Sequence, residues 1–204
     1  MPTDKSTPKY TAPALEKGLD LLEVLAGAAQ PMGLSNLAKA MGRSVSEIFR
    51  MALTLEQRGY LILDGDDRYR LSLKMLELSH RQQPLRSLVA TATPVMRELA
   101  GRVYQSCHLS TYHDGQLLVV AQVDAPGPFT MGAKVGALAK LSDTASGKVL
   151  LAFRDDAERT RMLAAQVRIH GELEIDAAHL FQQIEEVRRN GVITSPSTRV
   201  RGSI

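Results

Sequence analysis

Residues 34–73, LSNLAKAMGRSVSEIFRMALTLEQRGYLILDGDDRYRLSL, contain a change of hydrophobic period that decides the fold. Up to Gly59 the apolar residues recur every three or four positions, which is typical of helices. From Tyr60 they alternate with polar residues, which is typical of strands. The pattern predicts a short helix, a longer helix and then a hairpin whose two strands are joined by DGDD at 64–67, because Asp and Gly tolerate the backbone angles of tight turns.

Capping residues mark where these two helices begin. We expect Ser35 to cap the short helix, which ends at Gly42. Ser44 caps the longer helix, and Glu47 three residues later completes a capping box. This helix is predicted to end at Arg58-Gly59 and to bury one stripe of side chains, formed by Ile48, Met51, Ala52 and Leu55.

A further helix precedes this segment. Residues 1–13 mix Pro, Thr, Lys and Ser without periodicity and are interpreted as a mobile arm. A helix then runs to Gly27 and is predicted to bury the face formed by Leu15, Leu19, Leu22 and Ala26. Helix, short helix, helix and hairpin outline a winged helix-turn-helix domain over residues 14–71.

The rest of the chain predicts a linker helix over residues 72–84 and a second domain over residues 85–204. This domain opens with an apolar helical run over 85–103 that Pro94 breaks or kinks. Two strands follow over 106–112 and 117–123, then a strand that enters a helix near Thr144, and helices over 155–166 and 175–189. The predicted fold class is therefore α+β.

Composition bounds the class of protein without identifying a partner. With 44% hydrophobic and 23% charged residues the chain is globular. The net charge of +3 does not indicate nucleic acid by itself, because the 84 residues before Leu85 hold 11 basic and 10 acidic residues. A single cysteine excludes an intramolecular disulfide, and neither a signal peptide nor an apolar run of about 20 residues is present. We expect a cytoplasmic protein without membrane contact.

The longer helix carries a polar face opposite its buried stripe, formed by Ser46, Glu47, Arg50, Thr54 and Gln57. In a major groove Arg reaches guanine edges and Ser reaches bases or phosphate. The alternative is an ordinary solvated face, but the preceding short helix and the following hairpin favour DNA binding. In the hairpin, Arg68 and Arg70 alternate with Tyr69 and so point to one side, and the acidic tip predicts that the second strand approaches DNA.

The segment LSDTASGKVLL at 141–151 places Gly-Lys at a strand-to-helix turn. It fails the phosphate-binding loop pattern, which requires Gly at Ser142 and Ser or Thr at Val149. Asp143 or Thr144 at the helix N-terminus leaves backbone N–H groups near Ala145 and Ser146 available to a small carboxylate. A plain capped helix is the alternative, with about even weight.

No motif supports an enzyme, a cofactor or a metal site. Cys107 and His108 are neighbours on a predicted strand, so their side chains point to opposite faces and cannot form a nucleophile and its base. The sequence contains no H-E-x-x-H, paired C-x-x-C or G-x-S-x-G pattern. We therefore expect no catalytic residue.

The elements placed above resemble those of IclR-type bacterial transcriptional regulators. TLEQRGYL at 54–61 resembles the family's TLxxxGYL signature, and TASGKVLLA at 144–152 resembles its TAxGKxLLA motif, which is the more specific match. The resemblance implies a GAF-like effector-binding domain, a homodimer or homotetramer, binding to double-stranded operator DNA, and a small organic acid as effector.

The resemblance also implies site residues. Ser46 and Arg50 match the family's recognition helix, whereas Val45 and Glu47 remove a cation and add an anion. The DNA-binding residues expected from pattern and resemblance together are Ser35, Ser44, Ser46, Glu47, Phe49, Arg50, Arg68 and Arg70. The expected effector-binding residues are Met131, Ser142, Asp143, Thr144, Ala145, Ser146 and Ser203. Asp143 replaces a small apolar residue of the family and disfavours an anionic ligand unless it points away as a helix cap.

The chain stops at Ile204, where the family continues into a last strand and helix, so we expect an effector domain that is incomplete at its C-terminus. The leading hypothesis is a DNA-binding transcriptional regulator whose C-terminal domain senses a small organic acid. The alternative is a ligand-binding or protein-interaction module that uses the winged helix for protein contacts.

Overall fold

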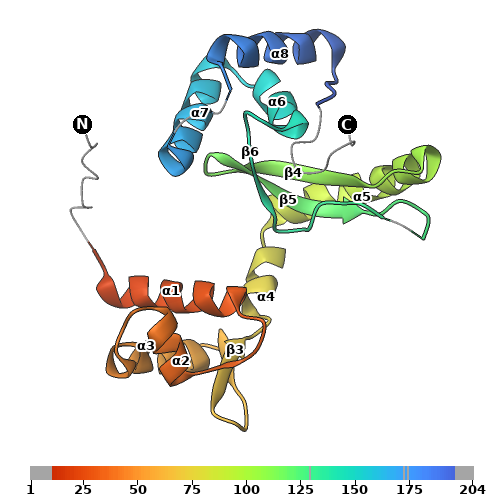
Figure 1. Ribbon diagram of the computed structural model, residues 1–204. Coiled ribbons are helices and arrows are strands. Elements are labelled where there is room, and N and C mark those ends of the chain that lie inside the picture. Colours follow the sequence, from red (N-terminus) through yellow and green to blue (C-terminus); the bar gives the residue numbers. More distant parts are fainter. Residues whose placement is uncertain (1–10, 129, 172, 174, 196–204) are drawn as a thin grey trace, which may run out of the picture. The chain divides into compact units, whose positions relative to one another are not determined.

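The computed structural model describes residues 11–128, 130–171, 173 and 175–195 (Figure 1). Most of the expected mobile arm and the expected effector residue Ser203 therefore lie outside the described residues. The chain divides into two compact units, Met1–Gln83 and Pro84–Ile204. The α+β prediction with an N-terminal helix-turn-helix is confirmed.

The first unit has the predicted order of helices and hairpin. Its elements are α1 (Pro13–Gly27), β1 (Met32–Gly33), α2 (Leu34–Ala40), α3 (Val45–Gln57), β2 (Leu61–Leu63), β3 (Arg68–Leu71) and α4 (Lys74–His80). The strands form an antiparallel sheet in the order β1-β3-β2. Met32 pairs with Tyr69, so the two residues of β1 extend the hairpin to a third strand that the sequence pattern did not reveal.

The core of the first unit lies between the three helices and the sheet. Its members have at most 6% of their surface exposed and are Leu21, Leu25, Leu37, Ala38, Ile48, Ala52, Leu61 and Tyr69. Two of the four residues expected in the buried stripe of α3, Ile48 and Ala52, are fully buried, and Met51 and Leu55 are partly buried.

The predicted buried face of α1 is wrong. Leu15 is 63% exposed and Leu19 49% exposed, whereas the buried residues are Gly18, Leu21 and Leu25. Leucines stand on two faces of this helix, so helical spacing alone fits either of them. Packing against α3 selects the face that is buried.

The second unit combines helices with an antiparallel sheet in the order β4-β5-β6. Its elements are α5 (Gln83–Val103), β4 (Cys107–His113), β5 (Gln116–Val123), β6 (Leu138–Lys140), α6 (Ala145–Ala152), α7 (Asp156–His170) and α8 (Ala177–Asn190). Figure 1 shows α6, α7 and α8 grouped together above the sheet. Their core contains Leu117, Leu141, Leu151, Ala152, Met162, Leu180, Ile184 and Val187.

Helix α5 runs through Pro94 as one helix of 21 residues, so of the two outcomes expected at Pro94, a break or a kink, the break into two helices does not occur. A proline inside a helix removes one backbone hydrogen bond and costs about 3 kcal/mol, which a helix of this length tolerates when one face is packed. Met96 and Ala100 supply that packed face. Among the described residues, no helix is long and apolar enough to cross a membrane.

Candidate nucleic-acid interface and effector cavity

The N-terminus of α3 has the predicted capping box. The Ser44 hydroxyl accepts a hydrogen bond from the Glu47 N–H at 3.4 Å, and the Ser44 N–H donates to Glu47 Oε2 at 2.9 Å. The Ser44 hydroxyl also donates to Glu47 Oε2 at 2.9 Å. Two backbone N–H groups that a helix start leaves unpaired are thereby satisfied, which fixes where α3 begins.

Glu47 is also tied to the first helix. Lys17 on α1 places its Nζ 3.1 Å from Glu47 Oε1. The Glu47 pKa is lowered from 4.5 to about 2. The hydrogen bond from the Ser44 N–H is the largest cause, and the hydrogen bond from the Lys17 ammonium is the next. Glu47 is therefore a charged structural residue whose anion is compensated by Lys17, which reduces the repulsion of phosphate expected from sequence.

The exposed face of α3 carries Ser46 and Arg50, with Phe49 beside them at 47% exposure. The guanidinium of Arg50 has no hydrogen-bond or ion-pair partner among the residues that the structure describes. Thr54 is also exposed, but its hydroxyl donates to the Arg50 carbonyl at 2.8 Å. Of the predicted polar face, Ser46, Arg50 and Gln57 are exposed side chains that have no protein partner within the described ranges.

The hairpin presents its two arginines as predicted. Along β3, Tyr69 is 6% exposed and packs into the core, whereas Arg68 and Arg70 are exposed on the opposite side. Within the described part of the chain neither guanidinium has a hydrogen-bond or ion-pair partner. This side of β3 is therefore cationic.

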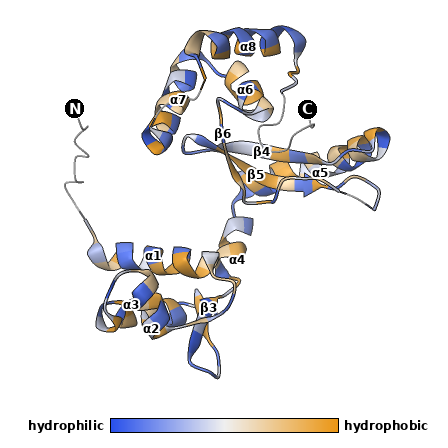
Figure 2. Ribbon diagram, in the orientation of Figure 1, coloured by the Kyte–Doolittle hydropathy of each residue, from blue (hydrophilic) through white to orange (hydrophobic). Residues whose placement is uncertain are grey.

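The tip of the hairpin is hydrophilic (Figure 2). Asp64 Oδ1 accepts from the N–H groups of Asp66 and Arg68, both at 3.0 Å. Asp67 adopts a φ of 55°, which its short side chain tolerates. The acidic residues thus build the turn, and they leave its end negative.

Ser35 does not cap α2. The helix begins one residue earlier, at Leu34, and its N-cap is Gly33, which supplies no side-chain hydrogen bond. Gly33 is held in extended geometry by its pairing with Arg68 in the sheet. Strand pairing, which local sequence cannot show, therefore sets the start of α2 and places Ser35 exposed in its first turn.

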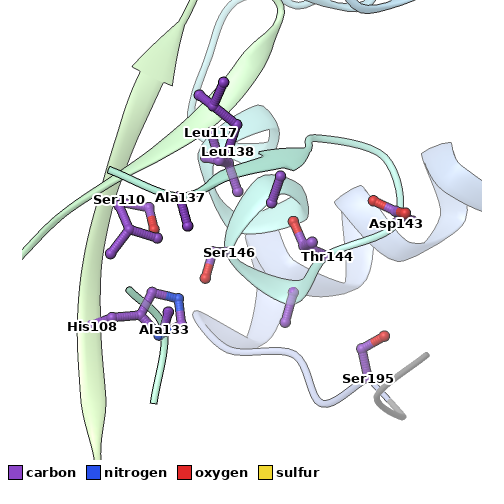
Figure 3. A pocket seen from close by; sticks show the side chains of 13 residues that line it. His108, Ser110, Leu117, Ala133, Ala137, Leu138, Asp143, Thr144, Ser146 and Ser195 are labelled. Carbon is purple, nitrogen blue, oxygen red and sulfur yellow. The ribbon is translucent and has the colours of Figure 1, made fainter. Parts of the chain in front are cut away.

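A cavity of about 280 Å³ lies in the second unit between the sheet and the N-terminus of α6 (Figure 3). Its polar lining comes from β4, from the start of α6 and from the segment after α8. The lining residues are His108, Ser110, Leu117, Val119, Ala133, Ala137, Leu138, Ala139, Asp143, Thr144, Ala145, Ser146 and Ser195. The volume suits a ligand smaller than a typical drug molecule.

Thr144 is the N-cap of α6. Its hydroxyl accepts from the Gly147 N–H at 3.1 Å and donates to the Lys140 carbonyl at 2.8 Å. Of the two caps considered from sequence, the structure uses Thr144 and leaves Asp143 in the cavity wall. The backbone N–H groups of Ala145 and Ser146 belong to the first turn and have no intrahelical acceptor. The positive end of the helix therefore faces the cavity.

Asp143 brings an acceptor to the same wall. Its Oδ1 is buried and has no hydrogen-bond partner among the residues that the structure describes. Lys148 lies on α6, is 3% exposed, and its charge interacts with Asp143. Burial lowers the Lys148 pKa, and the negative charge of Asp143 opposes this shift. The wall thus combines an unpaired carboxylate oxygen with a nearby cation.

His108 and Ser110 alternate along β4 and share the face that meets the cavity. More than a third of His108 is exposed, yet desolvation of the enclosed part of its ring lowers its pKa. Cys107 turns the other way and donates its thiol to the Met96 carbonyl at 3.4 Å. The two residues therefore form no nucleophile–base pair.

The structure places the expected effector residues in different surroundings. Four of them, Asp143, Thr144, Ala145 and Ser146, line the cavity together. Ser142 is fully buried against Gln166 and turns away from the cavity, and Met131 is 64% exposed and does not line it.

Sequence reasoning missed the other nine lining residues, which include His108 and Ser110 on β4 and Ser195 after α8. The period of two along β4 could have joined His108 to Ser110, but nothing local connects them to α6. Within the described ranges, no group of three or more His, Cys, Asp or Glu side chains is placed to hold a metal ion.

The family model for the IclR helix-turn-helix domain matches residues 14–65. The model for the bacterial transcriptional regulator IclR C-terminal domain matches residues 84–199, more than half of the chain. Among solved structures, an IclR homologue from Microbacterium hydrocarbonoxydans complexed with 4-hydroxybenzoate has a TM-score of 0.75 at 19% identity, covering 90% of this chain and 77% of that one. Pseudomonas aeruginosa HmgR has a TM-score of 0.72 at 23% identity, covering 94% and 80%. These two likenesses concern the fold.

Curated relatives agree with the family models. The regulator KdgR of Dickeya chrysanthemi is 28% identical over 86% of this chain and 58% of its own length. KdgR of Escherichia coli is 30% identical over 72% of this chain and 56% of its own length. The chain thus spans a little under three fifths of either relative. Both family models and these relatives show that the chain belongs to the IclR family of bacterial transcriptional regulators.

Proposed function

We propose that this chain regulates transcription by binding operator DNA through its first unit. Helix α3 enters the major groove, where Arg50 contacts a guanine edge and Ser46 contacts a base or phosphate. Arg68 and Arg70 on β3 contact the phosphate backbone or the adjacent minor groove. The observation that carries the proposal is the exposure of these three arginines without a protein partner in the described part of the chain.

Electrostatics around α3 supports the same surface. The anion of Glu47 is compensated by Lys17 and by the cap, so Arg50 is the uncompensated charge on the exposed face of α3. The acidic hairpin tip is repelled by phosphate, so we place β3, and not the tip, against the duplex. Affinity then depends on a few positioned arginines, because the unit as a whole is nearly neutral.

Fluorescence anisotropy with a labelled duplex from the gene's own upstream region tests this. Arg50→Ala should weaken specific binding by roughly 5- to 150-fold, the range for a lost guanine contact. Arg68→Ala should weaken binding evenly across sequences and reduce the salt slope by about one. Arg161→Ala, at an exposed position on α7, is the matched control. Absence of binding at every salt concentration, or binding insensitive to salt, contradicts the proposal. If the Arg50→Ala and Arg68→Ala variants kept their affinity for a partner protein, the result would instead support a protein-interaction module.

For the second unit we propose that the cavity binds a small organic acid that carries a hydroxyl group. Asp143 lines the cavity and does not cap α6, so its charge opposes a second anion, and the neighbouring Lys148 offsets part of that charge. We therefore place the ligand carboxylate at the N–H groups of Ala145 and Ser146, and the ligand hydroxyl at Asp143 Oδ1, which accepts from it. His108 and Ser110 supply further polar contacts from the facing strand. Bound acid shifts the balance between protomer arrangements and thereby the DNA affinity.

Calorimetric titration with 4-hydroxybenzoate, the acid bound by the Microbacterium homologue, tests this proposal. We expect saturable binding of 4-hydroxybenzoate and weaker binding of benzoate, which has no hydroxyl to pair with Asp143. Asp143→Asn should narrow the difference between the two acids. Failure of both acids to bind contradicts this ligand class.

We also propose that the chain acts as a homodimer or homotetramer. Leu15 and Leu19 expose apolar surface on α1, which supports contact between two copies. Sedimentation velocity of the wild-type chain and of Leu15→Glu tests this. A monomer at all concentrations, or an assembly that Leu15→Glu leaves intact, contradicts α1 as the contact.

A further inference from the structure

Gln166 lies on α7, is fully buried, and joins its helix to the segment between β6 and α6. Its Oε1 accepts hydrogen bonds from the Leu141 N–H at 2.7 Å and from the Ser142 N–H at 3.2 Å. Its Nε2 donates to Ser142 Oγ at 2.8 Å. One side chain thus satisfies two buried backbone donors and one buried hydroxyl, at a distance of 24 or 25 residues along the chain.

The segment that Gln166 holds leads directly into the cavity wall. Leu141 and Ser142 precede Asp143–Ser146, the four consecutive residues that line the cavity. From the other side, Gly147 packs so closely that a Cβ there would collide with the Leu141 carbonyl oxygen. The backbone before α6 is therefore fixed on both sides, by the Gln166 amide and by the Gly147 backbone.

Helix α7 is itself held in place. A Cβ at Gly115 would lie 2.6 Å from the Ala165 carbonyl carbon and 2.7 Å from the Gln166 nitrogen, so the turn between β4 and β5 rests on the α7 backbone at Gln166. Arg159, also on α7, donates to the Leu151 carbonyl at 3.1 Å at the other end of α6. Helix α7 therefore holds the segment before α6 through Gln166 and the last turn of α6 through Arg159.

The chemistry at this position requires an amide. An apolar side chain of similar size would leave the Leu141 and Ser142 N–H groups buried and unpaired, which is far more costly than losing an exposed hydrogen bond. An amide offers one acceptor for both N–H groups and a donor for the hydroxyl. Gln166 is not among the residues that line the cavity.

From this geometry we propose that Gln166 is a positioning residue of the effector site. It sets the place of the Asp143–Ser146 wall and so sets effector affinity without touching the ligand. The expected effect on effector affinity rests on the proposed effector-binding function. The positioning of the segment before α6 by Gln166 can be measured without a ligand.

Hydrogen exchange of backbone amides on the full chain, followed by NMR, tests the positioning. In Gln166→Met we expect exchange at Leu141, Ser142 and Gly147 to accelerate by about tenfold or more, the equivalent of one lost buried hydrogen bond. The Ile184 amide in α8 should keep its wild-type exchange rate. If Gln166 only stabilised the unit as a whole, its replacement would accelerate exchange at Ile184 as well. Gln182→Met, on the exposed surface of α8, is the control and should change none of these rates.

Two further measurements complete the test. Ser142→Ala removes only the hydrogen bond from Gln166 Nε2. It should therefore raise the exchange rates of the same three amides less than Gln166→Met does. If Gln166→Met does not fold, Ser142→Ala alone tests the positioning role. The affinity for 4-hydroxybenzoate should fall at least about fivefold in Gln166→Met and stay unchanged in Gln182→Met. Wild-type exchange at Leu141 and Ser142 in the variants overturns the proposal. A wild-type chain that binds no 4-hydroxybenzoate would contradict the proposed ligand, while the exchange rates would still decide the role of Gln166.

Discussion

Lys17 on α1 and Glu47 in the first turn of α3 form an ion pair with 3.1 Å between Nζ and Oε1. The same carboxylate closes the capping box with Ser44. The start of the proposed recognition helix is thus joined to the neighbouring helix through one side chain. The sequence predicted that Glu47 belongs both to the capping box and to the DNA-facing side; the structure confirms the capping box and adds the ion pair with Lys17.

This pair predicts an acid-sensitive first unit. The folded-state Glu47 pKa of about 2 lies below the ordinary 4.5, so ionised Glu47 stabilises the fold above about pH 4.5, and this contribution is lost as the pH falls toward 2. Glu47→Gln should remove that part of the pH dependence. Urea unfolding followed through the Ile48 and Ala52 amide resonances measures it, with Glu23→Gln on the exposed side of α1 as control. An identical pH dependence in Glu47→Gln and wild type would contradict the assignment.

Ser44 and Ser46 separate stability from DNA contact. Ser44→Ala removes the N-cap of α3 and should lower the free energy of unfolding by about 1 kcal/mol. Ser46→Ala removes an exposed hydroxyl without a cap role, so it should change stability by less than about 0.5 kcal/mol and weaken operator binding. Urea unfolding and anisotropy on the same two variants check both statements. The assignment fails if Ser46→Ala is the more destabilised variant.

Gly147 is expected to be intolerant of any side chain. A Cβ at this position meets the backbone of Leu141, which is held by Gln166 and cannot give way cheaply, so Gly147→Ala should cost about 1–3 kcal/mol. Gly101→Ala, in α5 where a Cβ meets nothing within 4 Å, should instead stabilise by up to about 1 kcal/mol. Thermal unfolding of both variants gives the comparison, and equal effects would refute the close approach of α6 to Leu141.

His108 is expected to report occupancy of the cavity. Desolvation lowers the His108 pKa below the ordinary 6.5. The unfolded state therefore takes up the proton more readily than the folded state, and the fold loses stability as the pH falls below about 6.5. An anionic ligand beside the ring should raise this pKa, because it favours the imidazolium. An NMR titration of the imidazole with and without 4-hydroxybenzoate checks this, with the other histidines as internal references. A lower pKa in the presence of bound acid would exclude contact between the acid and His108.

The local signals of the sequence were sufficient for much of the fold. Ser44 and Glu47 predicted the start of α3, because a capping box depends only on residues within four consecutive positions. Alternation predicted that Arg68 and Arg70 point to one side of the strand, since the period of a strand assigns neighbours to opposite faces, and both arginines are exposed while Tyr69 between them is buried. The TASGKVLLA segment likewise predicted a helix that begins beside Thr144.

Other features followed from contacts that no local pattern encodes. Both faces of α1 carry leucines, so only packing against α3 decided that Leu21 is buried and Leu15 exposed. The pairing of Gly33 with Arg68 moved the start of α2 away from Ser35. Both outcomes depend on residues that lie on different elements of the chain.

The sequence by itself determined the helix and strand periods, the caps and the arginines of the proposed DNA surface, because each is a relation among neighbours along the chain. Only the tertiary structure decided that Glu47 is bound to Lys17, that His108 and Ser110 face Ser146 across a cavity, and that Ser142 is buried against Gln166. The physical reason is the same in each case. Burial and hydrogen bonding of a polar side chain are settled by whichever distant backbone or side chain packs against it, and that partner is chosen by the fold as a whole.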